Sequence, residues 1–334
     1  MPFDPDAPAQ AGGLYGLEIH PSDALVHVQA VPWQATTSYR RGTREGPAAL
    51  IQASAQVDLH DLEYGESWRA GIVLSPANPN FAVWDGEAEK PALRVIESLG
   101  HDPDAAAQVN ALSERVNAAV YDAAIAALNA GKIPALIGGD HSCPFGLIRA
   151  VAERFPGVGI LHIDAHADLR EAYEGFTHSH ASIMFNVVRY IPDVSHVMQV
   201  GIRDVGAAEA AMISDTPTRI TTFFDPVVAG WLAEGETWVH VVDAITAALP
   251  NPVYISFDVD GMDPALCPGT GTPVPGGLGY RDVCVLLKKL SERRRIVGFD
   301  LNEIGPGEWD GNVAARVLYK LFGATVASQR VAIT

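Results

Sequence analysis

The sequence contains little cysteine and no long apolar run. Its three cysteines, Cys143, Cys267 and Cys284, are an odd number at no metal-binding spacing, which argues against a disulfide framework. We expect Cys143 to pack at the start of a helix. No apolar run reaches the roughly 18 residues that a membrane span needs, and residues 1–13 lack the charged and apolar regions of a signal peptide. These absences predict a soluble, cytoplasmic protein.

Basic residues are scarce as well. The chain has 23 Lys and Arg against 40 Asp and Glu, a formal net charge of −17. Nucleic acids and anionic membranes call for a basic surface, so neither is an expected partner. The acidity favours a cationic substrate only weakly, since surface acidity most often serves solubility.

Apolar residues make up 48% of the 334-residue chain, enough for a large core. Apolar runs that predict strands alternate with stretches that predict helices. We therefore predict one α/β domain over residues 1–334, a three-layer α/β/α fold around a doubly wound, mostly parallel sheet. Residues 1–25 are an expected N-terminal extension, and 62–95 an expected irregular excursion. The predicted strands are 26–33, 133–139, 158–164, 196–203, 252–258 and 295–301, and the predicted helices are 104–130, 144–155, 238–249, 280–293 and 312–325.

Four segments carry most of the functional information: ALIGGDHS at 135–142, GILHIDAHAD at 159–168, VYISFDVDGMDP at 253–264 and IVGFDLNEIGP at 296–306. Each begins as an apolar run that reads as a strand buried on both faces and then breaks into polar residues. In an open parallel sheet, ligands bind beyond the carboxyl ends of the strands. Six side chains should therefore meet in one crevice: His141, Asp164, His166, Asp168, Asp258 and Asp260.

This group of residues predicts a metal site. Four carboxylates crowded at buried strand ends would repel one another, and divalent cations remove that repulsion. If residues 164–168 stay extended, their three ligands point one way. Six ligands exceed the four that a tetrahedral zinc ion takes, so two ions sharing carboxylates fit better, and the donor types suit manganese, with nickel, cobalt and zinc as competitors. A single DxH or DxD would be weak evidence; the combination is strong. His162, inside its strand, is expected to be a packed histidine.

The segments GGDHS, DAHAD, SFDVDGMDP and PGTGTPVPGGL resemble the metal-binding signatures of the ureohydrolases, the arginase and agmatinase family. The resemblance covers residues 29–325, with the motifs in family order. It implies an arginase-like fold, hydrolysis of a guanidino compound to urea and an amine at two Mn²⁺ ions, and assembly into trimers or hexamers. It also implies that one ion is held by His141, Asp164, Asp168 and Asp258, and the other by His166, Asp164, Asp258 and Asp260, with Asp164 and Asp258 bridging.

The catalytic groups implied are Glu303, His180 and the ligand Asp168. Two cations would lower the pKa of a water molecule far enough to form a hydroxide near neutral pH, and this hydroxide would attack the guanidinium carbon. In the family pattern a glutamate placed like Glu303 binds the guanidinium, and a carboxylate there would orient and balance that cation. By strand alternation, Asp300 and Asn302 should point elsewhere.

A histidine is needed to give the leaving amine a proton. The segment 171–182 contains two, His178 and His180. Ser179-His180-Ala181 resembles the catalytic histidine motif of the agmatinase-like branch, so we assign the proton shuttle to His180. His178 remains the alternative.

Substrate choice is predicted from two departures from the arginase pattern. Glu171 and Glu174 stand where arginases carry the polar residues that hold the α-carboxylate of arginine, and Gly206 stands where they carry an acid for the α-ammonium group. Both departures favour agmatine, with Glu171 and Glu174 near its tail. The alternatives are an arginase, a guanidine hydrolase, a formiminoglutamase, a guanidinobutyrase if Arg170 or Arg203 intervenes, and a non-catalytic metal-stabilised binding protein.

Overall fold

The computed structural model describes residues 12–333, and within them one sheet has eight strands in the order β2-β1-β3-β8-β7-β4-β5-β6. Every neighbouring pair is parallel. The strands are β1 (Val26–Val31), β2 (Ile72–Leu74), β3 (Ile133–Gly138), β4 (Val158–Ile163), β5 (Val194–Val200), β6 (Ile220–Phe223), β7 (Val253–Asp258) and β8 (Ile296–Asn302).

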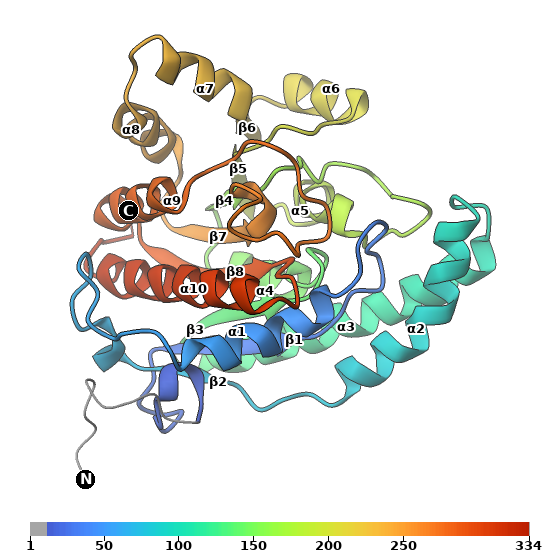
Figure 1. Ribbon diagram of the computed structural model, residues 1–334, viewed down its shortest axis with the longest axis horizontal. Coiled ribbons are helices and arrows are strands. Elements are labelled where there is room, and N and C mark those ends of the chain that lie inside the picture. The colour runs from blue at the N-terminus through green and yellow to red at the C-terminus, as the bar shows by residue number, and fades with distance from the viewer. Residues whose placement is uncertain (1–11, 334) are drawn as a thin grey trace.

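Helices cover both faces of this sheet (Figure 1). One apolar core packs α1 (Gly46–Ser54), α8 (Trp238–Ala248), α9 (Tyr280–Arg293) and α10 (Glu308–Ser328) on one face. A second core packs α2 (Asn80–Glu97), α3 (Pro103–Asn129), α4 (Phe145–Arg154) and α5 (Ile183–Tyr190) on the other. The helices α6 (Ala207–Asp215) and α7 (Asp225–Ala233) flank β6 at one end of the sheet. The predicted three-layer α/β/α fold is confirmed.

Four strands at the centre of the sheet are buried along their whole length: β3, β8, β7 and β4. Helices on both faces leave these strands no solvated side, which explains their continuous apolar sequences. Because all strands run the same way, their carboxyl ends lie along one edge. The four polar segments singled out in the sequence follow these four strands and are therefore neighbours in space.

The prediction of an irregular excursion at 62–95 is wrong in its second half. This stretch contains β2 and most of α2, which begins at Asn80. Gly86 and Pro91 lie inside α2 and read as helix breakers. The helix forms because its apolar positions, which include Phe81 and Val95, are buried in the core.

The expected N-terminal extension also joins the core in part. Leu14, Tyr15 and Leu17 are buried, and the Tyr15 hydroxyl donates to the carbonyl of Ala315 in α10. The extension's residues 1–11 lie outside the described residues.

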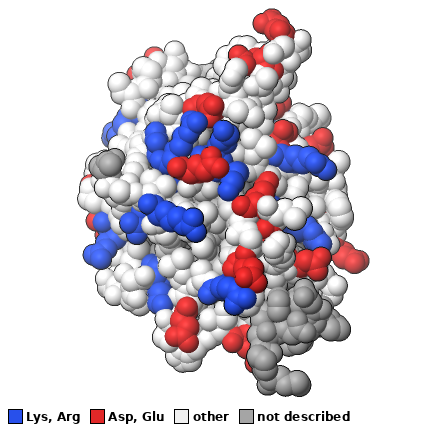
Figure 2. Space-filling view, turned by 90° about the vertical axis from the view of Figure 1, so that its left-hand side faces the viewer, with Lys and Arg blue, Asp and Glu red and all other residues white. Residues whose placement is uncertain are grey.

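No helix within residues 12–333 has the length and apolar character that crossing a membrane would require. On the face drawn in Figure 2, Lys and Arg side chains lie interspersed with Asp and Glu.

Candidate metal centre

The first part of the centre surrounds His141, in the loop after β3. Its Nδ1 lies 2.9 Å from Asp164 Oδ2, 3.3 Å from Asp168 Oδ2 and 3.3 Å from Asp258 Oδ2. All four side chains are buried. The loops after β3 and β4 and the last residue of β7 thus bring one imidazole and three carboxylates together.

The second part shares Asp164 with the first. His166 Nδ1 lies 3.1 Å from Asp260 Oδ2 and 3.5 Å from Asp164 Oδ1. Asp164 therefore turns one oxygen to each group, as a bridging ligand would. All six side chains predicted as ligands meet at this edge of the sheet. Asp258 contacts His141 Nδ1 through Oδ2 and the backbone NH of Asp260 through Oδ1.

The loops do not stay extended, contrary to the premise for residues 164–168. Asp164 Oδ1 accepts from the backbone NH of His166 at 2.7 Å, and Asp258 Oδ1 accepts from that of Asp260 at 2.8 Å. These are Asx turns, in which a carboxylate bonds to the backbone two residues on. Asp168 has a φ of 55°, a left-handed conformation that costs of order 1–3 kcal/mol outside glycine. The turns, rather than strand alternation, bring the ligands together.

The electrostatics of the cluster favour cations. Burial raises the pKa of Asp168 to about 8, with Asp164 adding to the effect, and burial raises that of Asp258 well above its usual range. Burial alone would lower the pKa of His166, yet Asp260 and Asp164 raise it to about 12. Without metal ions, these side chains tend to retain protons, and bound divalent ions would replace the protons and balance the negative charge. Two sets of donors have ligand atoms within 4.8 Å of one another and fit two such ions: His141, His162, Asp164 and Asp168 form the first set, and Asp164, His166 and Asp260 form the second.

His162 lies at the first set, and its role follows from its hydrogen bonds. Its Nε2 is 2.8 Å from Asp164 Oδ2, and its Nδ1 is 3.1 Å from Gln199 Nε2. Gln199 Nε2 also donates to the carbonyl of Ala167 at 2.7 Å, while Gln199 Oε1 accepts from Thr222 at 2.8 Å, which fixes the amide orientation. His162 Nδ1 is therefore an acceptor, and its Nε2–H donates to Asp164. The histidine is packed, as expected, but it also holds the shared carboxylate.

Glu303 follows β8 with a φ of 60°. Its Oε1 accepts from the backbone NH of His141 at 3.0 Å, whereas its buried Oε2 has no hydrogen-bond partner within the described residues. Burial, with Asp140 and Asp260 nearby, raises its pKa well above its usual range. A buried carboxylate oxygen left free in this way is suited to receive a cationic donor.

Asp300 and Asn302 remain in the sheet interior. Asp300 accepts from Tyr254 and Ser256, and the Ser256 hydroxyl lies 3.0 Å from His141 Nε2. Asp300 therefore supports the far side of the His141 ring. Strand alternation correctly predicts that Asp300 points away from the ligands, but it does not reveal this contact with His141 through Ser256.

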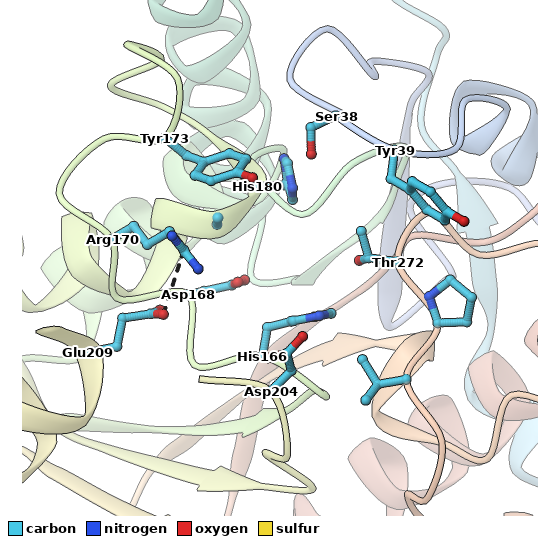
Figure 3. A pocket seen from close by; sticks show the side chains of 13 residues that line it. Ser38, Tyr39, His166, Asp168, Arg170, Tyr173, His180, Asp204, Glu209 and Thr272 are labelled. Carbon is cyan, nitrogen blue, oxygen red and sulfur yellow. Dashed lines mark ion pairs between the residues drawn. The ribbon is translucent and has the colours of Figure 1, made fainter. Parts of the chain in front are cut away.

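A pocket of about 250 Å³ opens beside the cluster (Figure 3). Among its lining residues are His166, Asp168 and His180. Burial lowers the pKa of His180 to about 4, with His166 adding to the effect, so its ring is neutral near pH 7. His178 instead lines a separate cavity and contacts Glu114 through Nε2 at 2.9 Å. This arrangement favours His180 over His178.

The structure does not place Glu171 and Glu174 among the residues that line this pocket, so the pocket does not support their predicted place at the substrate tail. Glu171 lines the cavity that contains His178, and Glu174 packs its backbone against Gly100. The cause is the tie between their loop and α3, where the Asn110 side chain bonds to the carbonyl of Gly175 and the NH of Thr177. These two bonds fasten residues 175–177 to α3.

Other charged residues line the pocket instead: Arg170, Asp204 and Glu209. Arg170 Nε lies 3.6 Å from Glu209 Oε2, and its guanidinium lies 4.9 Å from the centre of the Tyr173 ring. A Cβ at Gly206 would sit 3.6 Å from Arg170 Nη2 and 2.9 Å from Glu209 Oε2. The space of a side chain at 206 is thus taken by the Arg170–Glu209 pair.

Arg203 has a structural position. Its guanidinium donates to backbone carbonyls that include Asp260, Met262 and Val274. It therefore fastens the loop after β7 and does not line the pocket.

The fold and the paired cluster define a three-layer α/β protein with donors for two metal ions. Residues 24–324 match the sequence pattern of the arginase family, and the chain belongs to that family. This confirms the resemblance drawn from the four motifs. The chain is accordingly a hydrolase of C–N bonds in guanidino compounds.

Relatives with named activities are similar over most of their length. The chain is 31% identical to the N(1)-aminopropylagmatine ureohydrolase of Synechocystis sp. over 92% of both chains. It is 27% identical to the agmatinase of Pyrococcus horikoshii, over 90% of this chain and 92% of the relative. The crystal structure of the agmatine ureohydrolase of Thermoplasma volcanium superimposes with a TM-score of 0.71 at 25% identity, over 97% of this chain and 94% of the other.

Proposed function

We propose that this chain hydrolyses agmatine to putrescine and urea with two bound Mn²⁺ ions. The observation that carries the proposal is the free, buried Oε2 of Glu303 beside a paired cluster of metal donors. It is supported by relatives named for agmatine and aminopropylagmatine.

The six clustered side chains would hold the ions. The first would bind His141, Asp164, Asp168 and Asp258, and the second His166, Asp164, Asp258 and Asp260. When bound, two such ions would lower the pKa of a water molecule so that it loses a proton near pH 7 and becomes a nucleophile, and they would polarise the group under attack.

Glu303 would bind and orient the guanidinium. Its Oε2 lacks a donor, and a guanidinium offers a planar fork of N–H groups that matches a carboxylate. Because its Oε1 is fixed by the NH of His141, Glu303 would place the guanidinium carbon beside the ions. The positive substrate would also offset the burial that raises the pKa of Glu303.

His180 would give a proton to the leaving amine. It lines the pocket and is neutral near pH 7, so it can take a proton from solvent or the attacking water and pass it on. The amine would leave toward the pocket mouth.

The walls of the pocket support a cationic tail. Apart from the metal ligands, two carboxylates, Asp204 and Glu209, face one cation, Arg170. The pair of Arg170 with Glu209 leaves Asp204 as the unbalanced charge, which favours the ammonium group of agmatine over the carboxylate of guanidinobutyrate. Aminopropylagmatine, which extends the same amine, is the second candidate because of the relatives that carry its name.

A urea-release assay on the manganese-reconstituted protein tests the proposal. The panel is agmatine, aminopropylagmatine, arginine, guanidinobutyrate and guanidine, with formiminoglutamate followed by loss of substrate. We expect kcat/KM to be highest for agmatine and at least about tenfold lower for arginine, as for a like-charge clash of about 1.4 kcal/mol. Arginine at or above agmatine would overturn the substrate assignment, and no turnover of any compound would favour a binding protein.

A further inference from the structure

Thr36 lies in the loop after β1, outside every motif that carries the metal ligands, and is fully buried. Its hydroxyl sits between two buried groups. Thr36 Oγ1 is 2.9 Å from Asp140 Oδ2 on one side and 3.3 Å from His180 Nδ1 on the other. One threonine thus links the acid of the GGDHS motif to the histidine of the pocket.

The direction of the hydrogen bonds is set by Asp140, which is completely buried. Its two oxygens receive four donors, the backbone NH and hydroxyl of Thr36 and the backbone NH and hydroxyl of Ser142. A carboxylate only accepts, so the hydroxyl proton of Thr36 is directed to Asp140. The lone pairs of Thr36 Oγ1 are left to face His180.

His180 meets these lone pairs twice. Its backbone NH donates to Thr36 Oγ1 at 3.0 Å, and its Nδ1 lies next to the same oxygen. The other neighbour of Nδ1 is Ser179 Oγ, slightly farther away at 3.4 Å and itself accepting from the NH of Ala181. The arrangement holds the proton of a neutral His180 on Nδ1 and leaves Nε2 for the pocket, into which Figure 3 shows the ring projecting.

We propose that Thr36 and Asp140 are positioning residues for His180. They fix the Nδ1–H tautomer and the ring orientation, so that Nε2 can take up and release the proton that the leaving amine needs. A hydroxyl polarised by a buried carboxylate also stabilises the imidazolium that forms during the transfer. The inference rests on the proposed function, because it gives His180 the role described there.

The test compares kcat for agmatine in Thr36→Val, Thr36→Ala and Thr36→Ser, each with and without His180→Ala. Thr36→Val and Thr36→Ala should lower kcat about 10- to 100-fold, the loss expected for one hydrogen bond to a charged group, with KM and manganese content unchanged. Thr36→Ser retains the hydroxyl and should keep most of the rate. In the His180→Ala background, Thr36→Val should have no further effect.

A purely structural role for Thr36 gives a different pattern. Equal fold losses from Thr36→Val with and without His180 would overturn the proposal, as would a Thr36→Ser variant as slow as Thr36→Val. If the unmodified enzyme is active and Thr36→Val and Thr36→Ala keep its full activity, the positioning role of Thr36 and Asp140 is overturned, while the proposed function stands. An unmodified protein that releases no urea from agmatine would overturn the proposed function and, with it, the role of His180.

Discussion

The two sides of the pocket differ in what positions their residues. On the metal side, His141, Asp164 and Asp258 lie at or just after the carboxyl ends of buried strands. Glu171 and Glu174, which the sequence predicts on the tail side, lie farther along a loop that turns back on itself and is tied to α3, and they do not line the pocket. A strand end has its place fixed by sheet register, whereas a loop residue is placed by contacts from elsewhere in the chain. Motif position is therefore informative on the first side and misleading on the second.

The same contrast separates the two histidines of the 171–182 loop. His180 begins a short 3-10 helix and is anchored by Thr36, while His178 contacts Glu114 of α3. We expect His180→Ala to lose about 10² to 10⁴ in kcat, the range for general acid catalysis, while keeping both metal ions. His178→Ala, the matched control, should lose far less. Steady-state kinetics with metal analysis checks the pair, and the reverse ranking would move the proton shuttle to His178.

A smaller effect, on manganese affinity, is expected from His162, which holds the carboxylate of Asp164. Removing its bond to Asp164 in His162→Leu should weaken manganese binding about 10- to 100-fold, as loss of a residue that orients a ligand does. Gln199→Leu should act in the same direction, because Gln199 fixes the tautomer of His162. Isothermal titration calorimetry measures the manganese affinity of both variants. His196→Leu is the control, because His196 lies on β5 together with Gln199. Unchanged affinity in His162→Leu would show that Asp164 is held well enough without it.

Metal removal should make stability depend on pH in a predictable direction. In the folded chain the pKa of Asp168 is raised to about 8 and that of His166 to about 12. Between pH 6.5 and 8 the folded state therefore retains protons that the unfolded state loses, and the free energy of unfolding falls as pH rises, by up to about 2 kcal/mol for each proton.

Bound ions replace those protons, so the stabilisation by manganese should grow over this window. His180, with a pKa of about 4, is neutral in both states near the upper end of it and adds little. Melting temperatures of metal-free and reconstituted protein at pH 6.5 and pH 8 measure the difference. A metal-dependent shift that shrinks toward pH 8 would mean that the cluster is not held protonated.

The smallest effect is expected on the tail side. Glu171→Gln and Glu174→Gln should leave the ratio of kcat/KM for agmatine and arginine unchanged, because neither residue lines the pocket. Asp204→Asn, which removes a pocket carboxylate, should lower that ratio by a few-fold to about tenfold. If the loop glutamates alter the ratio and Asp204 does not, the loop must close over the pocket during turnover.

Most of the metal ligands could be predicted from the sequence because they lie close to the ends of buried strands. DAHAD and DVD each place ligands within a few residues of a buried strand, and parallel order brings those strands together. Asp300, Gln199 and Thr36 could not be found in this way. Each acts through a partner that is distant in the chain, and each reads as an ordinary polar residue in its own segment.

The fold shows the same division. Long buried strands and amphipathic helices such as α3 and α9 were predicted close to their observed bounds. The three-residue strand β2 and the helix α2 were not. β2 is defined by pairing with β1, and α2 tolerates Gly86 and Pro91 because its apolar face packs in the core.

The central claim is that two ions share one cluster through Asp164, and the manganese content of the protein tests it most directly. Protein stripped of metal, reconstituted with Mn²⁺ and freed of excess should contain two ions per chain, and urea release from agmatine should rise as both sites fill. Asp164→Ala should lose both ions together, since this carboxylate contacts both sets of ligands. One ion per chain with full activity would contradict the account.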